Sequence, residues 1–343
     1  MLIQPRVWIS RGQRRDGALP RLRLSAAHDE WNHVGIALAA MELGLFAEEG
    51  LDDVELITFP EDSGQLLDRE AYQAEVLAQG IADVGIDPRT TFILEGRDQG
   101  RPLAIIAARR KNHAFLVMGE PGLKSLDDLR GRTLYMNHPG GATDVMLRRV
   151  LKDSDIEPDE DVTIQYVGGQ MHNPAQIVAE FREGKHGPAI LTSFKESQEL
   201  VDEGAYTVLA DLRTLYSSRH DRVTAANSDF IAKNPESVKG FLKGMIRSCN
   251  WVLDPANAAR FREIIVSAGF MRDERELANF DGLFTGWQER VSRDLTLPAD
   301  GIGLIVEEAR SDGRVSPTFR VEDALALDQL AAAQRELAVI STT

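Results

Sequence analysis

The first hundred residues alternate between short apolar runs and segments with a helical period. Residues 22–26 alternate apolar and polar side chains, which predicts a strand, and residues 54–59 are predicted to form a second strand that ends before Pro60. Between them, apolar residues recur every three or four positions over 34–45, which predicts a helix. The pattern continues with a helix over 69–79, a strand over 82–86, a helix over 91–95 and a strand over 103–108. This βαβαβαβ order predicts a mostly parallel sheet flanked by helices.

A second α/β unit of similar size follows, and then a helical tail. Strands are predicted over 133–136, 162–167, 188–191 and 206–209, with helices between them. After residue 222 one further short strand precedes helical patterns that need a surface to cover. We therefore predict a flexible arm over 1–20, a discontinuous first unit over 21–110 and 222–343, and a second unit over 111–221.

Composition excludes several classes of protein. The 343 residues include 54 acidic and 39 Lys and Arg side chains, a formal charge of −15. Such a chain is not expected to bind nucleic acid, where Lys and Arg must neutralise phosphates. The one cysteine, Cys249, excludes an internal disulfide and a cysteine-cluster zinc site. No run approaches the ~20 apolar residues that span a bilayer, so we predict no transmembrane segment.

The N-terminal residues show no secretory signal. Residues 1–23 carry six arginines, and the longest apolar run is Val7-Trp8-Ile9. A signal peptide needs an apolar core of about 7–15 residues. As written, the chain is expected to be cytoplasmic. A periplasmic or cell-surface location requires a different start or different processing.

Ligands of open α/β sheets bind beyond the carboxyl ends of the strands, so the loops there are the candidate site. The first such loop contains His28-Asp29-Glu30-Trp31-Asn32-His33. Trp31 can stack on a planar ligand, Asn32 and His33 can hydrogen-bond it, and an acidic neighbour can pair with a cation. An exposed polar loop with a capping asparagine is the alternative.

Loops at the ends of other strands add further candidate residues, one loop in the first unit and several in the second. Asp87, Arg89 and Thr90 follow the strand over 82–86, where the arginine pairs either with a ligand carboxylate or with an internal acid. In the second unit, the glycines of 137–143 precede a helix whose N–H groups favour an anion, although a simple turn is the alternative. The ligand-binding residues expected in the second unit are His138, Gly140, Gly141, Ala142, Thr143, Met171, His172, Ser193 and Phe194.

No metal or cofactor site is predicted. His28 and His33 are five residues apart, which on a helix separates them by about 140°. Residues 119–125 resemble a phosphate-binding loop, but Leu123 stands where glycine must precede the lysine. Cys249 lies in an apolar helical stripe and is expected to be buried core rather than a nucleophile.

Four segments resemble a known family: 44–51 (GLFAEEGL), 78–86 (AQGIADVGI), 122–131 (GLKSLDDLRG) and 234–242 (NPESVKGFL). The chain from Leu22 onward resembles the type II periplasmic-binding-protein fold. The similar branch includes sulfonate, nitrate, taurine and thiamine-pyrimidine-precursor binding proteins of ABC transporters. The resemblance implies an α/β fold of two lobes with crossovers near 107–117 and 212–226, and hinge closure on a ligand between them.

Two functions follow from this resemblance. The first is binding of a small organic anion or heteroaromatic molecule, for an ABC permease or as a cytoplasmic relative. The second is a cytoplasmic enzyme on the same fold, a decarboxylase, lyase or hydrolase that uses His33, His28 or Asp29 for acid–base chemistry. Relatives with synthase or desulfinase chemistry use cysteines, and the loop over 28–33 contains none.

Overall fold

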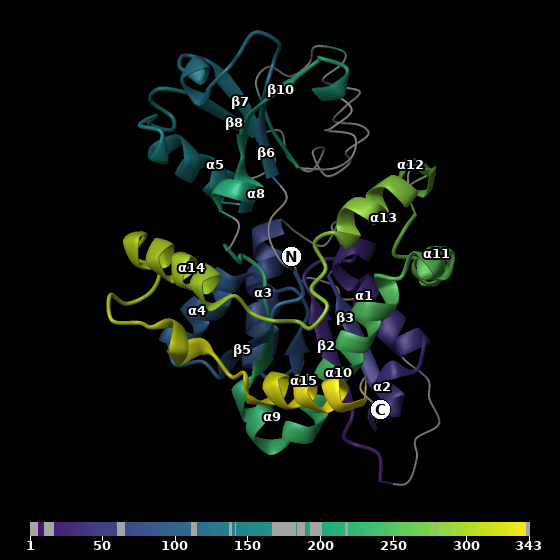
Figure 1. Cartoon of the computed structure of the whole chain (residues 1–343). Helices are drawn as coiled ribbons and strands as arrows, with labels where there is room; N and C mark the ends of the chain where they lie inside the picture. The colour runs from purple at the N-terminus through teal and green to yellow at the C-terminus, as the bar shows by residue number, and fades with distance from the viewer. Residues whose placement is uncertain are drawn as a thin grey trace. The chain divides into compact units, whose positions relative to one another are not determined.

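The protein divides into two compact units (Figure 1). The computed structural model describes residues 6–9, 17–59, 66–110, 115–136, 139–140, 142–166, 183, 189–192, 201–216, 219–272, 274–278 and 280–340. The first unit comprises Met1–Lys111, Ser218–Arg272 and Val291–Thr343. The second comprises Asn112–Ser217 and Asp273–Arg290.

The first unit is an α/β structure around one sheet. Its strands are β1 (Arg6–Ile9), β2 (Leu22–Ala26), β3 (Val54–Thr58), β4 (Val84–Gly85), β5 (Leu103–Ala107) and β11 (Thr224–Asn227). Its α-helices are α1 (Trp31–Glu42), α2 (Leu45–Glu48), α3 (Leu66–Ala78), α4 (Thr90–Asp98), α9 (Ser228–Lys233), α10 (Pro235–Val252), α11 (Ala258–Ser267), α14 (Ala299–Ser311) and α15 (Asp328–Ile340). Short 3-10 turns are η4 (Pro255–Asn257) and η5 (Val321–Ala324).

The sheet of the first unit is mixed. Its strand order among the described residues is β1-β3-β2-β4-β11-β5. Strands β3, β2 and β4 are parallel, whereas β11 runs antiparallel between β4 and β5. The α/β class is confirmed. Strands β2, β3, β4 and β5 all run in the same direction, since β4 and β5 are both antiparallel to β11, so the predicted mostly parallel arrangement is confirmed for these four strands. The exceptions are β1 and β11, and β11 runs in the opposite direction where the chain returns from the second unit.

Helix α1 is held against α10 and α11. In Figure 1, strands β2 and β3 lie between α3 and α1. Gly35 of α1 allows the close approach to α11, because a Cβ at this position would lie 2.7 Å from the Phe261 ring. Apolar side chains of α3, α4, β5 and α14 form a separate buried cluster that includes Phe59. The packing of α1 against α10 and α11, and the apolar cluster of α3, α4, β5 and α14, hold the helices in place against the sheet. The loops between these strands and helices are thereby fixed in position.

The second unit has its own mixed sheet. Its order among the described residues is β10-β6-β9-β7-β8, in which β9, β7 and β8 are parallel and β6 and β10 form antiparallel pairs. The strands are β6 (Phe115–Gly119), β7 (Thr133–Met136), β8 (Thr163–Tyr166), β9 (Ala189–Thr192) and β10 (Thr207–Asp211). The helices are η2 (Leu126–Leu129), α5 (Ala142–Asp153), α8 (Leu212–Leu215), α12 (Glu274–Ala278) and α13 (Phe280–Gln288). Helix α5 packs apolar side chains such as Leu147 and Leu151 into the core of this unit.

Two details of the predicted organisation differ from the structure. The expected flexible arm over 1–20 contains β1, which pairs antiparallel with β3, so that expectation was wrong for Arg6–Ile9. The expected first unit included all of 222–343, but α12 and α13 belong to the second unit. Among the described residues, no helix has the length and apolar character needed to cross a membrane.

Candidate functional site

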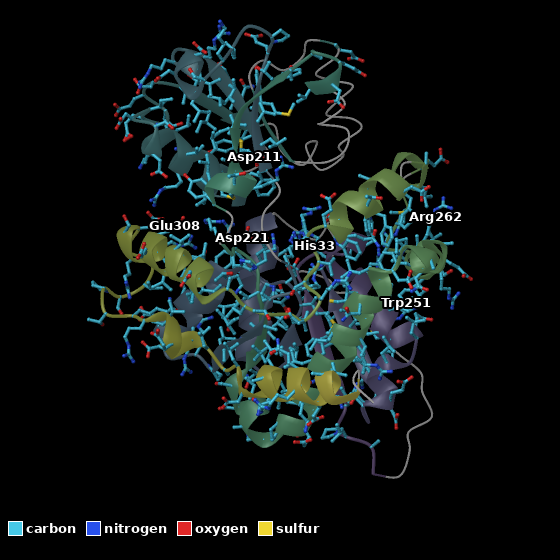
Figure 2. All side chains as sticks on the ribbon, viewed as in Figure 1. His33, Asp211, Asp221, Trp251, Arg262 and Glu308 are labelled. Carbon is cyan, nitrogen blue, oxygen red and sulfur yellow. The ribbon has the colours of Figure 1, made fainter. Side chains whose placement is uncertain are left out.

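Two histidines at the carboxyl end of β2 lie face to face in the first unit. His28 is in the loop after β2, and His33 is on the first turn of α1. Their rings stack with centroids 3.9 Å apart and planes 16° apart. His28 and His33 are both buried, at 5% and 8% exposure. The position of His33 in the first unit can be followed in Figure 2. The loop residue His28 and the helix residue His33 are thus in direct contact.

Asp87 anchors one side of this pair. It follows β4 with a φ of +61°, a backbone conformation that few residues other than glycine adopt. Its Oδ2 lies 2.9 Å from His33 Nδ1, 2.8 Å from an Nη2 of Arg109 and 2.5 Å from Nη2 of Arg110. One buried carboxylate oxygen thus accepts from an imidazole and two guanidinium groups.

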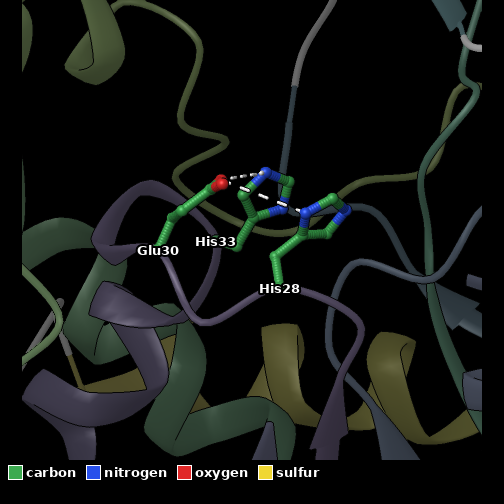
Figure 3. Close-up of side chains that lie close together, drawn as sticks. All are labelled: His28, Glu30 and His33. Carbon is green, nitrogen blue, oxygen red and sulfur yellow. Dashed lines mark ion pairs between the residues drawn. The ribbon is translucent and has the colours of Figure 1, made fainter. Parts of the chain in front are cut away.

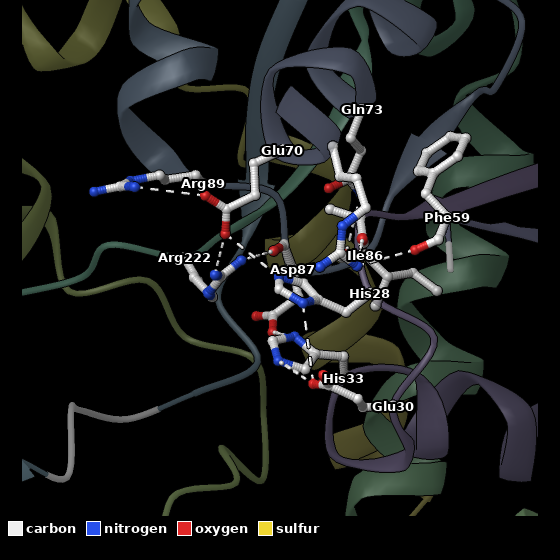
Figure 4. Close-up of polar contacts among 12 residues, drawn as sticks. His28, Glu30, His33, Phe59, Glu70, Gln73, Ile86, Asp87, Arg89 and Arg222 are labelled. Carbon is white, nitrogen blue, oxygen red and sulfur yellow. Dashed lines mark hydrogen bonds and ion pairs between the residues drawn. The ribbon is translucent and has the colours of Figure 1, made fainter. Parts of the chain in front are cut away.

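Glu70 anchors the other side from helix α3. Its Oε1 lies 3.3 Å from His28 Nε2 and accepts from Arg222, and its Oε2 lies 3.5 Å from Arg89 (Figure 4). Arg222 also donates to the Asp87 backbone carbonyl at 3.1 Å. The chain segments before α4 and before β11 meet here in an isolated bridge between Arg89 and Arg222.

Two further polar side chains of α3 tie the strand ends together. Arg69 donates to the carbonyls of Ala27 and Phe59 at 3.2 and 3.1 Å. Gln73 donates to the carbonyls of Ser25 and Ile86 at 2.8 and 3.2 Å (Figure 4). These bonds satisfy buried carbonyls where the strands end, and they hold the loops of the site in fixed positions.

The environment shifts the pKa values of all four central groups. Burial lowers the pKa of His28 to about 4, although Glu70 opposes that change. Burial and the neighbouring His28 lower the pKa of His33 well below its ordinary value. Burial alone would raise the pKa of Asp87 and of Glu70, but the adjacent arginines reverse this and lower both. At neutral pH the histidines are therefore neutral and both carboxylates are ionised.

His28, Glu30 and His33 together form a possible metal-ligand group. Glu30 is the N-cap residue of α1, but its side chain makes no capping hydrogen bond. Its Oε2 lies 3.6 Å from His33 Nε2 and 4.0 Å from His28 Nδ1 (Figure 3). All three ligand atoms lie within 4.8 Å of one another. The helical spacing used above to separate the two histidines was wrong, because His28 precedes the helix and the rings stack.

The other residues expected at this site have structural partners. Trp31 is buried at 4% exposure, and its ring lies edge-on to Phe261 at 6.3 Å. Thr90 donates from Oγ1 to the His220 carbonyl at 2.8 Å. Asn32 is a half-buried residue of α1. Asp29, the third acid–base candidate, pairs with Arg6 at 3.1 Å and with Arg272 at 3.6 Å.

In the second unit, the expected anion-binding N–H already has a partner. Gly140 has a φ of +68°, and its N–H donates to Asp144 Oδ2 at 2.7 Å. That carboxylate is also bound by Arg148 at 3.0 Å and by the Tyr166 hydroxyl at 2.9 Å. Ala142 and Thr143 begin helix α5. The other residues expected in this unit lie outside the described residues: His138, Gly141, Met171, His172, Ser193 and Phe194.

The sequence analysis missed four members of the site: Glu70, Arg109, Arg110 and Arg222. The two consecutive arginines follow the apolar strand β5 after Ala108, so the rule about carboxyl ends would have found them. Arg222 precedes β11, and its position became visible only once that strand proved antiparallel. Glu70 lies within a helix and has no comparable signal. The predicted burial of Cys249 is confirmed, and burial raises its pKa to about 12.

Comparison with known proteins connects this geometry to one family. The sequence profile of the family described as NMT1/THI5 like matches residues 30–258. The bicarbonate transport ATP-binding protein CmpC of Synechococcus elongatus is 23% identical over 260 residues, which are 71% of this chain and 37% of that protein. The chain therefore spans little more than a third of the length of this curated relative.

Solved structures share the fold. The periplasmic aliphatic sulphonate binding protein SsuA from Escherichia coli gives a TM-score of 0.64 at 15% identity, covering 90% of this chain and 92% of that chain. The periplasmic nitrate-binding protein NrtA from Synechocystis PCC 6803 gives 0.62 at 16% identity, covering 93% and 89%. These likenesses confirm the periplasmic-binding-protein type of fold that the sequence predicted.

Proposed function

Because the chain belongs to the NMT1/THI5-like family, we propose that it is a solute-binding protein of the ABC-importer type or a relative of one. Its ligand is a small organic anion or heteroaromatic molecule, and part of the site is the carboxyl edge of the first unit's sheet. The names of the relatives, which refer to sulphonate, nitrate and bicarbonate, support an anion. An ABC permease is the proposed partner.

One observation carries this proposal. Among the described residues, several buried guanidinium nitrogens at this edge have no hydrogen-bond partner: Nε of Arg89, Nε and Nη1 of Arg109, and Nε of Arg110. Buried donors are nearly always satisfied in folded proteins, so such a set needs an acceptor. An anion supplies one, and guanidinium groups bind planar oxyanions through paired hydrogen bonds.

Arg110 is the arginine best placed to meet a ligand. Its side chain is 20% exposed, whereas that of Arg109 is 2% exposed. Arg109 and Arg110 both donate to Asp87, which carries one negative charge against their two positive charges. An anion that binds at Arg110 would compensate the remaining positive charge. Local arginines thus allow an anion to bind a chain whose net charge is −15. The predicted closure of two lobes over the ligand stays a prediction.

Calorimetric titration of the full chain tests the proposal. Nitrate, bicarbonate, an alkanesulfonate and an aminopyrimidine are titrated separately, and we expect at least one to bind. Arg110→Gln should weaken that binding at least tenfold, because a charged hydrogen bond in a buried site contributes about 2 kcal/mol or more. Arg110→Lys should lie between the two, since it keeps the charge but loses the planar fork.

Arg260→Gln is the matched control, because Arg260 lies on α11 with a half-exposed side chain, and its ion-pair partner is Glu263 on the same helix. It should leave the affinity unchanged. Absence of binding by all four compounds, or equal affinity of Arg110→Gln and the unsubstituted chain, would contradict the proposal. Cell fractionation then separates an import receptor, found outside the cytoplasm, from a cytoplasmic binding relative.

A further inference from the structure

His220, in the segment that leads into β11, hydrogen-bonds the backbone of Arg110. Its Nε2 lies 2.6 Å from the Arg110 carbonyl oxygen. A carbonyl oxygen only accepts hydrogen bonds, so Nε2 carries a proton and donates it. His220 is buried, at 2% exposure. This imidazole therefore contacts the main chain of the arginine on which the proposed anion binding depends.

The backbone of His220 is itself held by two helices of the first unit. Thr90, at the start of α4, donates from Oγ1 to the His220 carbonyl at 2.8 Å. The His220 N–H donates to the Gly301 carbonyl in α14 at 3.4 Å. The preceding residue, Arg219, donates to Glu308 of α14 through Nε at 3.1 Å and through Nη2 at 2.7 Å (Figure 2 labels Glu308). The imidazole thus extends toward Arg110 from a main chain that is fixed on both sides.

A second segment of the first unit holds the main chain at Arg110 from its other side. Arg110 and Val291 form an antiparallel bridge, and the Ser292 N–H donates to the Arg109 carbonyl at 2.8 Å. Consecutive carbonyls of an extended chain point in opposite directions. The Arg109 carbonyl therefore meets Ser292, whereas the Arg110 carbonyl points away from that segment and accepts from His220.

We propose that His220 is a positioning residue for the anion site, which rests on the function proposed above. Its Nε2–H fixes the main chain of Arg110, while Asp87 Oδ2 holds the guanidinium at 2.5 Å from Nη2. The arginine side chain is then held at its root and at its far end, so few of its many rotamers remain. Paired hydrogen bonds to an anion need that order, because binding groups must be held to within about 0.5 Å.

Calorimetric titration of His220→Phe tests this inference, with nitrate, bicarbonate, an alkanesulfonate and an aminopyrimidine again as the probes. Phenylalanine keeps an aromatic ring but lacks the donor, so the compound that binds the unsubstituted chain should bind at least fivefold more weakly. His220→Gln has a side-chain N–H that can reach the same carbonyl, and it should restore the affinity to within twofold.

Asn227→Ala is the matched control for a general loss of stability. Asn227 is buried at the end of β11, where its side chain donates to the Leu77 carbonyl at 2.8 Å. It pairs with Leu103 at the start of β5, so it lies at the edge of the sheet opposite Arg110. The control should unfold at a lower temperature than the unsubstituted chain and bind the same compound equally well.

The proton on His220 Nε2 gives a readout in the unsubstituted chain, which keeps the test open if His220→Phe does not fold. A buried, hydrogen-bonded imidazole proton exchanges slowly and gives a separate downfield ¹H signal, which His220→Gln assigns by its loss. The compound that binds should shift this signal with the same midpoint as in calorimetry, and Arg110→Gln should weaken that response together with the affinity.

Three results would each overturn the inference while the effect of Arg110→Gln leaves the proposed function standing. They are equal affinity of His220→Phe and the unsubstituted chain, no recovery of affinity in His220→Gln, and a His220 signal that stays in place as the compound binds. If none of the four compounds binds the unsubstituted chain, the proposed function fails and this inference fails with it.

Discussion

Asp87 in the first unit and Asp144 in the second are equally buried, at 3% exposure, but they are compensated differently. Asp87 lies among Arg109, Arg110 and His33, and its arginines retain donors without a partner in the described part of the chain. Asp144 accepts from a backbone N–H, a tyrosine hydroxyl and an arginine with a side chain 32% exposed. A site with surplus donors can take a ligand anion, whereas the Asp144 carboxylate already occupies the N–H that was expected to bind one.

The same substitution at both positions gives the largest expected difference. Asp87→Asn leaves two arginines without their counter-charge and should lower the free energy of unfolding by about 3–5 kcal/mol. Asp144→Asn should cost about 1 kcal/mol, because the amide oxygen still accepts from Gly140 and Arg148 keeps its ion pair with Asp159. Urea unfolding followed by circular dichroism and tryptophan fluorescence measures both. Equal losses would show that the arginines around Asp87 do not depend on it.

The second prediction concerns pH and the histidines. A pKa of about 4 for His28 in the folded state, against about 6.5 when unfolded, means that the unfolded chain binds the proton more readily. Stability should therefore fall as the pH drops from 6.5 toward 4, by about 3 kcal/mol for His28 alone. His33, whose pKa is also lowered, adds to the loss in the same direction.

His28→Gln in metal-free protein sharpens this test. The lowered pKa values of Glu70 and Asp87 stabilise the folded state, and this contribution is lost only below about pH 4.5. The range from pH 6.5 to 5 therefore reports on the histidines. Between pH 6.5 and 5, the free energy of unfolding should depend less steeply on pH for the variant than for the unsubstituted chain. The difference between the two slopes should reach about 1.4 kcal/mol per pH unit, the contribution of one proton. Parallel stability curves for the variant and the unsubstituted chain would contradict the low pKa of His28.

The part of this site that the sequence predicted comes from strands with strong apolar patterns. Strand β2 occupies the predicted residues 22–26, and β4 lies within the predicted 82–86. Once those strands are known, the residues that follow them must lie at one edge, which is how His28, His33, Asp87 and Arg89 were found. In the second unit the same rule pointed to residues 137–143, where the Gly140 N–H donates to Asp144.

The electrostatic partners could not be predicted in the same way. Glu70 and Arg222 are 152 positions apart, and their ion pair depends on which strand lies beside which. The chain re-enters the sheet as β11 between β4 and β5, and no local pattern specifies that order or its direction. Whether Arg89 pairs with a ligand or an internal acid was likewise open, and in the structure it pairs with Glu70.

The smallest expected effects come from one glycine in each unit. In a helix, alanine normally stabilises relative to glycine by about 0.5–1 kcal/mol, but at Gly35 the new Cβ would lie 2.7 Å from Phe261. Gly35→Ala should therefore destabilise by a net ~1–2 kcal/mol through overpacking. Gly140→Ala, at a φ of +68°, should cost about 1 kcal/mol through backbone strain.

The two glycine variants also differ in what else they change. Gly35 sits two residues after His33 on α1, so a shift of this helix against α11 should also weaken the ligand affinity measured by titration. Gly140→Ala keeps the N–H that donates to Asp144 and should leave that affinity unchanged within error. If Gly35→Ala is as stable as the unsubstituted chain and binds ligand equally well, the contact between α1 and α11 does not position His33. The difference between the two units would then rest on their charges alone.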